Sequence, residues 1–139
     1  MELQVGVKIL LKNSEGRYLL LHRSPERYPE VDNPWDIPGG RIEPGIPLLE
    51  NLKREVQEET GLTLEKEPTL IAAQDILRIS GRHVVRLTFV GEIAGEPKLN
   101  PDEHNNFQWF SLEELRNLEG LDGYLKDMLL TKNSENQNE

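Results

Sequence analysis

The segment from Pro47 to Gly61 constrains the fold most, because it carries the signals of one amphipathic helix. Pro47 suits a first helical position, and Gly61 suits the residue that ends a helix in a left-handed conformation. The apolar residues between them fall on one face at helical spacing: Leu48, Leu49, Leu52 and Val56. Such a stripe must be buried against other elements, so the segment predicts a packed domain around this helix.

Predicted strands flank this helix on both sides. Apolar residues mostly alternate with polar ones over residues 4–11, and a second apolar run covers residues 18–21. Residues 70–79 and 83–93 form another pair, joined by a Ser-Gly-Arg connection typical of a hairpin. The stretch 24–34 contains three prolines and little periodicity, so we expect an irregular loop there. This order of elements indicates a mixed α/β or α+β domain.

Two short helices are expected after the last strand pair. Ser111-Leu112-Glu113-Glu114 has the capping-box pattern that begins a helix, and residues 121–130 fit a second helix. Residues 132–139 are polar and predict a disordered tail. A chain of 139 residues is large enough for one core and too short for two. We therefore expect a single domain over residues 1–131.

The composition favours a small-molecule partner. The formal net charge of -9 repels a phosphate backbone, so we expect no nucleic acid partner. No run is apolar enough to cross a membrane and no export signal is recognisable, so we expect no membrane partner and a cytoplasmic location. The absence of cysteine excludes thiolate catalysis and cysteine-bound zinc. An acidic protein that handles phosphates would need a metal ion.

Three glutamates on the predicted helix are candidate metal ligands. Glu55, Glu58 and Glu59 stand at i, i+3 and i+4, so their side chains share one face. Like charges at this spacing repel, and the last two oppose the helix dipole at a cost of roughly 0.3–1 kcal/mol each. A hard divalent cation would offset this cost, because carboxylates and phosphate oxygens both bind Mg²⁺. For the glutamates alone, a solvated acidic face is the better interpretation.

The residues before the helix favour the metal interpretation. A glycine-rich bend, Trp35-Asp36-Ile37-Pro38-Gly39-Gly40-Arg41-Ile42-Glu43-Pro44-Gly45, leads directly into the helix. Gly40, followed by Arg54-Glu55-Val56-Gln57-Glu58-Glu59-Thr60-Gly61-Leu62, resembles the signature of the Nudix (MutT-like) hydrolases. One signature glutamate is replaced, by Ile46. The resemblance extends over residues 4–130 and implies a Nudix-type α/β/α sandwich with a mixed central β-sheet.

The resemblance implies a role for each charged residue of the site. Glu55, Glu58 and Glu59 would supply metal ligands, and the carbonyl of Gly39 would add another. The expected ion is Mg²⁺, with Mn²⁺ as the alternative. The general base would be Glu55 or Glu103, which lies in a later acidic loop, and Glu55 is the preferred candidate.

Other residues of the signature would support the site. Gly40 would shape the bend, Gly61 would end the helix, and Arg54 would pair with the carboxylates. Because Ile46 lacks a carboxylate, we expect Glu50 to pair with Arg54 one helical turn later.

Three further residues have two interpretations each. Arg23 could contact a phosphate or could balance the acidic surface. Trp35 could stack on a base, although packing beside Ile37 is the favoured interpretation. His104, next to Glu103, could belong to the site or to an ordinary polar loop.

The expected activity is hydrolysis of the diphosphate linkage of a nucleoside diphosphate joined to another group. A nucleoside triphosphate, including a damaged one, or an ADP-ribose-like compound would fit. Water would attack phosphorus without a covalent enzyme intermediate. The alternative function, left open by Ile46, is a nucleotide-binding sensor with little or no turnover. A calcium-binding module is disfavoured because no loop has acidic residues at the required alternate positions.

Overall fold

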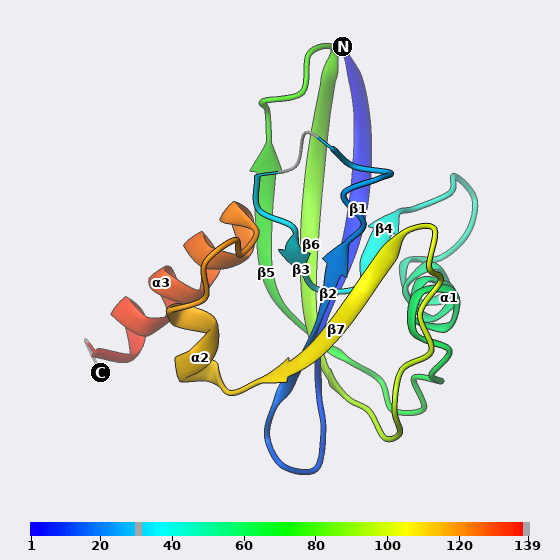
Figure 1. Ribbon diagram of the computed structural model, residues 1–139. Helices are drawn as coiled ribbons and strands as arrows, with labels where there is room; N and C mark the ends of the chain where they lie inside the picture. Colours follow the sequence, from blue (N-terminus) through cyan, green and yellow to red (C-terminus); the bar gives the residue numbers. More distant parts are fainter. Residues whose placement is uncertain (30–31, 138–139) are drawn as a thin grey trace.

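The computed structural model describes residues 1–29 and 32–137, with side chains up to residue 131. Seven strands form one sheet at its centre, with helices on either side (Figure 1). The strands are β1 (Glu2–Lys12), β2 (Tyr18–Arg23), β3 (Trp35–Asp36), β4 (Gly39–Arg41), β5 (Thr69–Ile76), β6 (Arg82–Glu92) and β7 (His104–Phe110). The helices are α1 (Leu48–Thr60), α2 (Leu112–Arg116) and α3 (Gly123–Gln137).

The sheet is mixed, as the sequence predicted. Its main path has the order β3-β2-β1-β6-β5, while β4 pairs with β1 and β7 pairs with β2. The central strands β1 and β6 are parallel, in register from Glu2 opposite Arg82 to Lys12 opposite Glu92. The β5–β6 pair is the antiparallel hairpin predicted from the sequence. Because β1 and β2 also receive β4 and β7, residues distant in sequence meet around these two strands.

Both faces of the sheet are covered, which confirms the α/β/α sandwich. α1 lies against one face, and α2 and α3 lie against the other (Figure 1). The alternation along β1 explains this arrangement, because successive side chains point to opposite faces. The α1 side buries Val7, Ile9, Leu11, Leu19, Leu52 and Val56. The other side buries Leu10, Leu20, Phe110, Leu115, Leu125 and Met128.

A buried asparagine fixes the start of α1. Pro47 offers no side-chain cap, and the Asn51 amide instead donates to the carbonyls of Ile46, at 2.9 Å, and Pro47, at 3.0 Å. The Asn51 side-chain oxygen accepts from the Glu43 N–H at 3.0 Å. The helix ends as predicted, with Gly61 in the left-handed region at φ 70°. The loop after β4 is therefore tied to the first turn of the glutamate-bearing helix.

The carboxyl-terminal elements include one strand that the sequence did not predict. The capping box is confirmed: the Ser111 hydroxyl accepts from the Glu114 N–H at 3.1 Å, and the Glu114 carboxylate accepts from the Ser111 N–H at 2.8 Å. β7 escaped prediction because its polar composition hides the strand, which forms by pairing with β2. The tail predicted over residues 132–139 stays a prediction: the α3 backbone continues to Gln137, and residues 138 and 139 lie outside the described residues. No described helix has the length and apolar character to span a membrane.

Candidate active site

Two adjacent glycines bring the backbone of β4 against β1 and α1. Gly39 has φ 147°, and a Cβ atom there would collide with the carbonyl oxygen of Val7. A Cβ atom on Gly40 would lie 2.9 Å from the carboxylate of Glu55. Position 39 therefore requires glycine, whereas a side chain at position 40 would have to displace the Glu55 carboxylate. The bend thus places backbone directly beside a candidate ligand.

The bend and the end of α1 border a polar cleft of about 230 Å³. Its walls come from the bend, α1, β1, β2, the loop after β2 and the start of β7. The lining residues are Lys8, Arg23, Tyr28, Asp36, Ile37, Gly39, Glu55, Glu59, Glu103 and His104. A larger hollow of about 650 Å³, beside the β1–β2 turn, contains none of the predicted site residues. The chemistry is therefore concentrated in the smaller cleft.

Glu59 is the most buried carboxylate of the helix, with 7% of its surface exposed. One carboxylate oxygen accepts the Gly39 N–H at 2.8 Å. Burial raises the pKa of Glu59 to about 8, with a further rise from Glu55 and Glu103, although Lys8 and the Gly39 N–H oppose the shift. A buried carboxylate of this kind is held in the folded protein at an energetic cost, which a bound cation would offset.

Glu55 lies half-buried beside Gly40 and is held by the neighbouring arginine. Arg54 donates to Glu55 at 3.2 Å, and its guanidinium also lies 3.1 Å from Glu43 and 3.7 Å from Glu58. Burial raises the pKa of Glu55, although the hydrogen bond from Arg54 opposes this shift. A carboxylate with a raised pKa is a better proton acceptor than an exposed one.

The predicted pairing of Glu50 with Arg54 is wrong. Among the described residues, the ion pairs of Arg54 are with Glu43, Glu55 and Glu58. Helical spacing places Glu50 within reach, but its side chain is exposed in the first turn. The loop anchored by Asn51 brings Glu43 to the guanidinium instead.

A buried charge network forms the inner wall of the cleft. Asp36 is 4% exposed. Its carboxylate oxygens form ion pairs with the side-chain nitrogens of Lys8 at 3.1 Å, Arg86 at 3.2 Å and Arg23 at 3.5 Å. Burial alone would raise the pKa of Asp36, but these three cations lower it to about 2. Arg86 continues the network to Asp122 at 3.0 Å. Two of the cations, Lys8 and Arg23, thus stand at the cleft in fixed positions.

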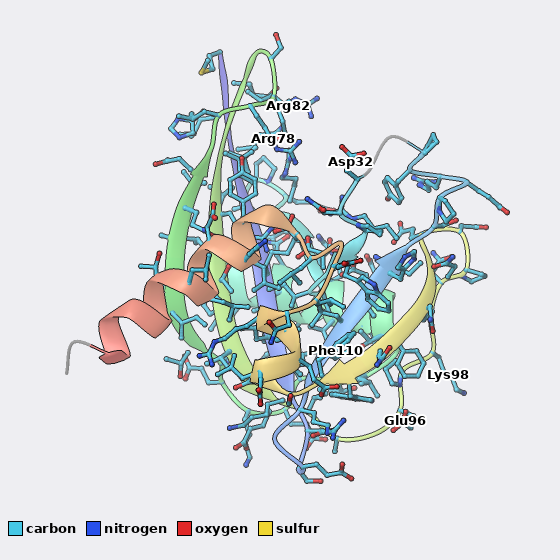
Figure 2. All side chains as sticks on the ribbon, turned by 60° about the vertical axis from the view of Figure 1, so that its left-hand side comes forward. Asp32, Arg78, Arg82, Glu96, Lys98 and Phe110 are labelled. Atoms are coloured by element: carbon cyan, nitrogen blue, oxygen red, sulfur yellow. The ribbon has the colours of Figure 1, made fainter. Side chains whose placement is uncertain are left out.

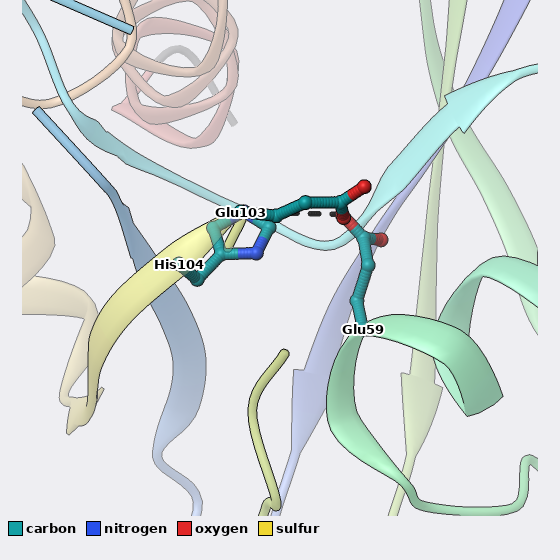
Figure 3. A group of neighbouring side chains, drawn as sticks. All are labelled: Glu59, Glu103 and His104. Atoms are coloured by element: carbon teal, nitrogen blue, oxygen red, sulfur yellow. Dashed lines mark ion pairs between the residues drawn. The ribbon is translucent and has the colours of Figure 1, made fainter. Parts of the chain in front are cut away.

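Glu103 and His104 enter the cleft from the start of β7, opposite the end of α1 (Figure 3). The Nε2 atom of His104 lies 3.9 Å from a carboxylate oxygen of Glu59. Burial lowers the pKa of His104 to about 4, and the cations Lys8 and Arg23 lower it further. The imidazole is neutral at neutral pH, so this contact is not a charge pair.

The structure brings together most of the residues predicted to bind metal, act as the base or contact the substrate. Gly39, Glu55, Glu59, Glu103 and Arg23 all line the cleft. Two residues of this group, Glu58 and Trp35, lie outside it. Glu58 has a side chain that is 61% exposed, and Trp35 packs edge-on against Phe110 at a centroid distance of 5.4 Å. The packing interpretation of Trp35 agrees with this contact.

Sequence reasoning missed three charged residues of the cleft wall, Lys8, Asp36 and Arg86, and left the place of His104 open. Lys8 and Arg86 occupy interior positions of otherwise apolar strands, and an unpaired charge in such a strand signals a buried partner. Asp36 precedes the glycine bend, but only the sheet brings its three cations to it. The burial of His104 depends on its pairing with Arg23 across two distant strands.

Comparison with known proteins identifies the family. The NUDIX domain family model matches residues 2–130. The chain belongs to the Nudix hydrolase family. This assignment agrees with the signature glutamates and with the α/β/α sandwich that carries them.

Individual Nudix relatives agree with this assignment. The crystal structure of the MutT protein from Methanosarcina mazei Go1 is 31% identical, with a TM-score of 0.82, covering 97% of this chain and 96% of that chain. A putative 8-oxo-dGTP diphosphatase from Mycobacterium tuberculosis is 27% identical over 110 residues, 77% of each protein. A human 8-oxo-dGDP phosphatase is 38% identical over 82 residues, which make up 59% of this chain and 23% of the human protein. The chain thus spans about a quarter of that relative.

Proposed function

We propose that this protein hydrolyses the phosphoanhydride of a nucleoside diphosphate joined to another group, with Mg²⁺ or Mn²⁺ as the cofactor. The observation that carries the proposal is the convergence of Glu55, Glu59 and Glu103 in one cleft beside the Gly39 backbone. Carboxylate and carbonyl oxygens are the donors that hard divalent cations prefer. Together with the family assignment, this donor set supports hydrolysis rather than a sensor that binds nucleotide without turnover.

The residues of the cleft fit a divalent cation. Glu55 and Glu59 would hold it with the Gly39 carbonyl, and Glu58 would join them or act from the rim through Arg54. A bound Mg²⁺ would neutralise phosphate oxygens and favour deprotonation of water. The raised pKa of Glu59 supports this assignment, because no lysine or arginine among the described residues lies within ion-pair distance of this buried carboxylate.

We assign proton removal from the attacking water to Glu55. Its carboxylate lies half-buried at the cleft, its pKa is raised, and Arg54 holds its orientation at 3.2 Å. Glu103 is the alternative base, since it lines the same cleft from the turn just before β7. Lys8 and Arg23, held by Asp36, would bind phosphate oxygens that face the inner wall.

The shape beside the cleft supports a nucleotide as the substrate. The cleft of about 230 Å³ is small for a whole nucleotide, since ligand sites commonly measure about 300–1,000 Å³. A neighbouring hollow of about 480 Å³ shares Arg23 with it and includes Tyr124 and Asp122. Asp32 and Arg78, which also line this hollow, are labelled in Figure 2. Phosphates in the cleft and a nucleoside in the hollow would use both spaces.

Oxidised guanine nucleotides are the first substrates to test, because two relatives are named for 8-oxo-dGTP and 8-oxo-dGDP. The protein is incubated with Mg²⁺ and a panel that adds canonical nucleoside triphosphates, ADP-ribose and dinucleoside polyphosphates. Nucleotide and phosphate products are then separated and identified. We expect turnover of at least one member. Tight nucleotide binding without turnover on the whole panel would support the sensor and overturn the proposal.

The choice of base is tested by two matched variants, Glu55→Gln and Glu103→Gln. Each removes one carboxylate and preserves the size of the side chain. We expect the larger loss of kcat in Glu55→Gln, on the order of 10²-fold or more. A larger kcat loss in Glu103→Gln, with metal affinity equal in the two variants, would transfer the role to Glu103.

A further inference from the structure

Glu59, Glu103 and His104 form a cluster with a mixed set of donor atoms. One ligand-type atom from each residue lies within 4.8 Å of the other two. Figure 3 shows Glu59 approaching from the end of α1 and the other two from the start of β7. Small side-chain rotations from these positions would bring two carboxylate oxygens and one imidazole nitrogen onto a single ion.

His104 is the unusual member of this cluster. It is 8% exposed, and its Nδ1 atom has no hydrogen-bond partner within the described part of the chain. Buried imidazoles in protein cores normally have such partners, because an unpaired buried polar atom is unfavourable. The other ring nitrogen faces the Glu59 carboxylate at 3.9 Å, too far for a hydrogen bond. The ring is thus buried in the cleft without the contacts that a purely structural histidine would make.

The donor atoms of the cluster determine which ion it would prefer, and they are two carboxylate oxygens and one imidazole nitrogen. Neutral imidazole is the form that binds metal ions. Nitrogen donors suit transition-metal cations, whereas Mg²⁺ prefers an all-oxygen set.

We propose that Glu59, Glu103 and His104 form a divalent-cation site with one nitrogen ligand, which selects Mn²⁺ and related transition-metal ions over Mg²⁺. The inference rests on the proposed function only in placing a cation in this cleft. Three protein ligands leave coordination positions open for water and phosphate oxygens. Glu103 is half-buried, so the open positions would face the substrate side of the cleft.

The test is pulsed electron paramagnetic resonance of the full chain, freed of metal with EDTA and loaded with Mn²⁺. A directly bound imidazole nitrogen produces a ¹⁴N modulation of the Mn²⁺ echo. The chain has three histidines, so His22→Gln, His83→Gln and His104→Gln assign the signal completely. We expect modulation in the wild type and in the first two variants, and its loss in His104→Gln.

The affinities provide a second readout. His104→Gln should weaken Mn²⁺ binding at least about tenfold and change Mg²⁺ binding less, measured by titration calorimetry. Absence of ¹⁴N modulation in the wild type would overturn the proposal without any variant, and so would its persistence in His104→Gln. Turnover with Mg²⁺ but no modulation would refute only the nitrogen ligand. Modulation without turnover on the nucleotide panel would refute only the proposed activity.

Discussion

Replacement of Glu59 by glutamine should abolish most turnover and also stabilise the metal-free protein. The side chain is buried, and its pKa is raised from 4.5 to about 8. Glutamine is neutral and nearly the same size, and its amide oxygen can still accept the Gly39 N–H. The substitution therefore removes the ionisable group and retains the packing.

The size of the stabilisation follows from the two pKa values. In the unfolded chain the carboxyl ionises near pH 4.5, whereas in the folded protein it stays protonated to about pH 8. Between these values each pH unit costs the folded wild type about 1.4 kcal/mol. At pH 7 the difference is about 3 kcal/mol, which Glu59→Gln should recover. Because the folded pKa is the raised one, the gain should vanish below pH 4.5 and level off above pH 8.

Urea unfolding in EDTA at several pH values measures this gain. The matched control is Glu58→Gln, since that side chain is 61% exposed and should give no comparable gain. A Glu59→Gln variant that is no more stable than the wild type at pH 7 would refute the reasoning. A gain that does not change between pH 4.5 and pH 8 would refute it equally, because desolvation of the charge would not be its cause.

Three further predictions concern the support of the site. Asp36→Asn should lower the unfolding free energy at pH 7 by about 3 kcal/mol, because it leaves buried cations unpaired. Because the pKa of the Asp36 carboxyl is lowered to about 2, the loss of unfolding free energy should shrink as pH falls below about 4. A loss that stays constant with pH in urea titrations would contradict this prediction. Gly40→Ala should reduce kcat at least about tenfold, because the added methyl group displaces the Glu55 carboxylate. The control Gly123→Ala, whose methyl group would lie in open space, should leave kcat unchanged. Equal rates for the two variants would argue against the close approach of the Gly40 backbone to Glu55. In double-mutant cycles of turnover, Arg54→Gln should couple to Glu43→Gln and not to Glu50→Gln, and the reverse result would restore the pairing expected from helical spacing.

The helix and its glutamates were predictable because their signals are local. Apolar spacing, Pro47 and Gly61 define α1 within fifteen residues, and the signature glutamates have fixed spacing on it. The same local logic failed for Arg54. Helical spacing favoured Glu50, but the loop before the helix returns Glu43 to the guanidinium through contacts that Asn51 makes.

The opposite wall of the cleft was not predictable in the same way. Asp36 meets Lys8 and Arg86 only because β1 pairs in parallel with β6 and β3 pairs with β2. His104 becomes buried because β7 adds to β2, with Arg23 opposite it in the register. These contacts join segments up to about eighty residues apart, and the spacing of residues along the chain carries no signal for them.

The central claim is that a cation held by the α1 glutamates drives hydrolysis of a nucleotide phosphoanhydride. Its most direct test is the initial rate on the best substrate of the panel, for metal-free wild type and Glu59→Gln, as Mg²⁺ or Mn²⁺ is added. We predict no turnover without metal, saturable activation of the wild type, and a loss of at least about 10²-fold in Glu59→Gln at saturating metal. Turnover by the wild type in EDTA, or full activation of Glu59→Gln, would contradict the claim.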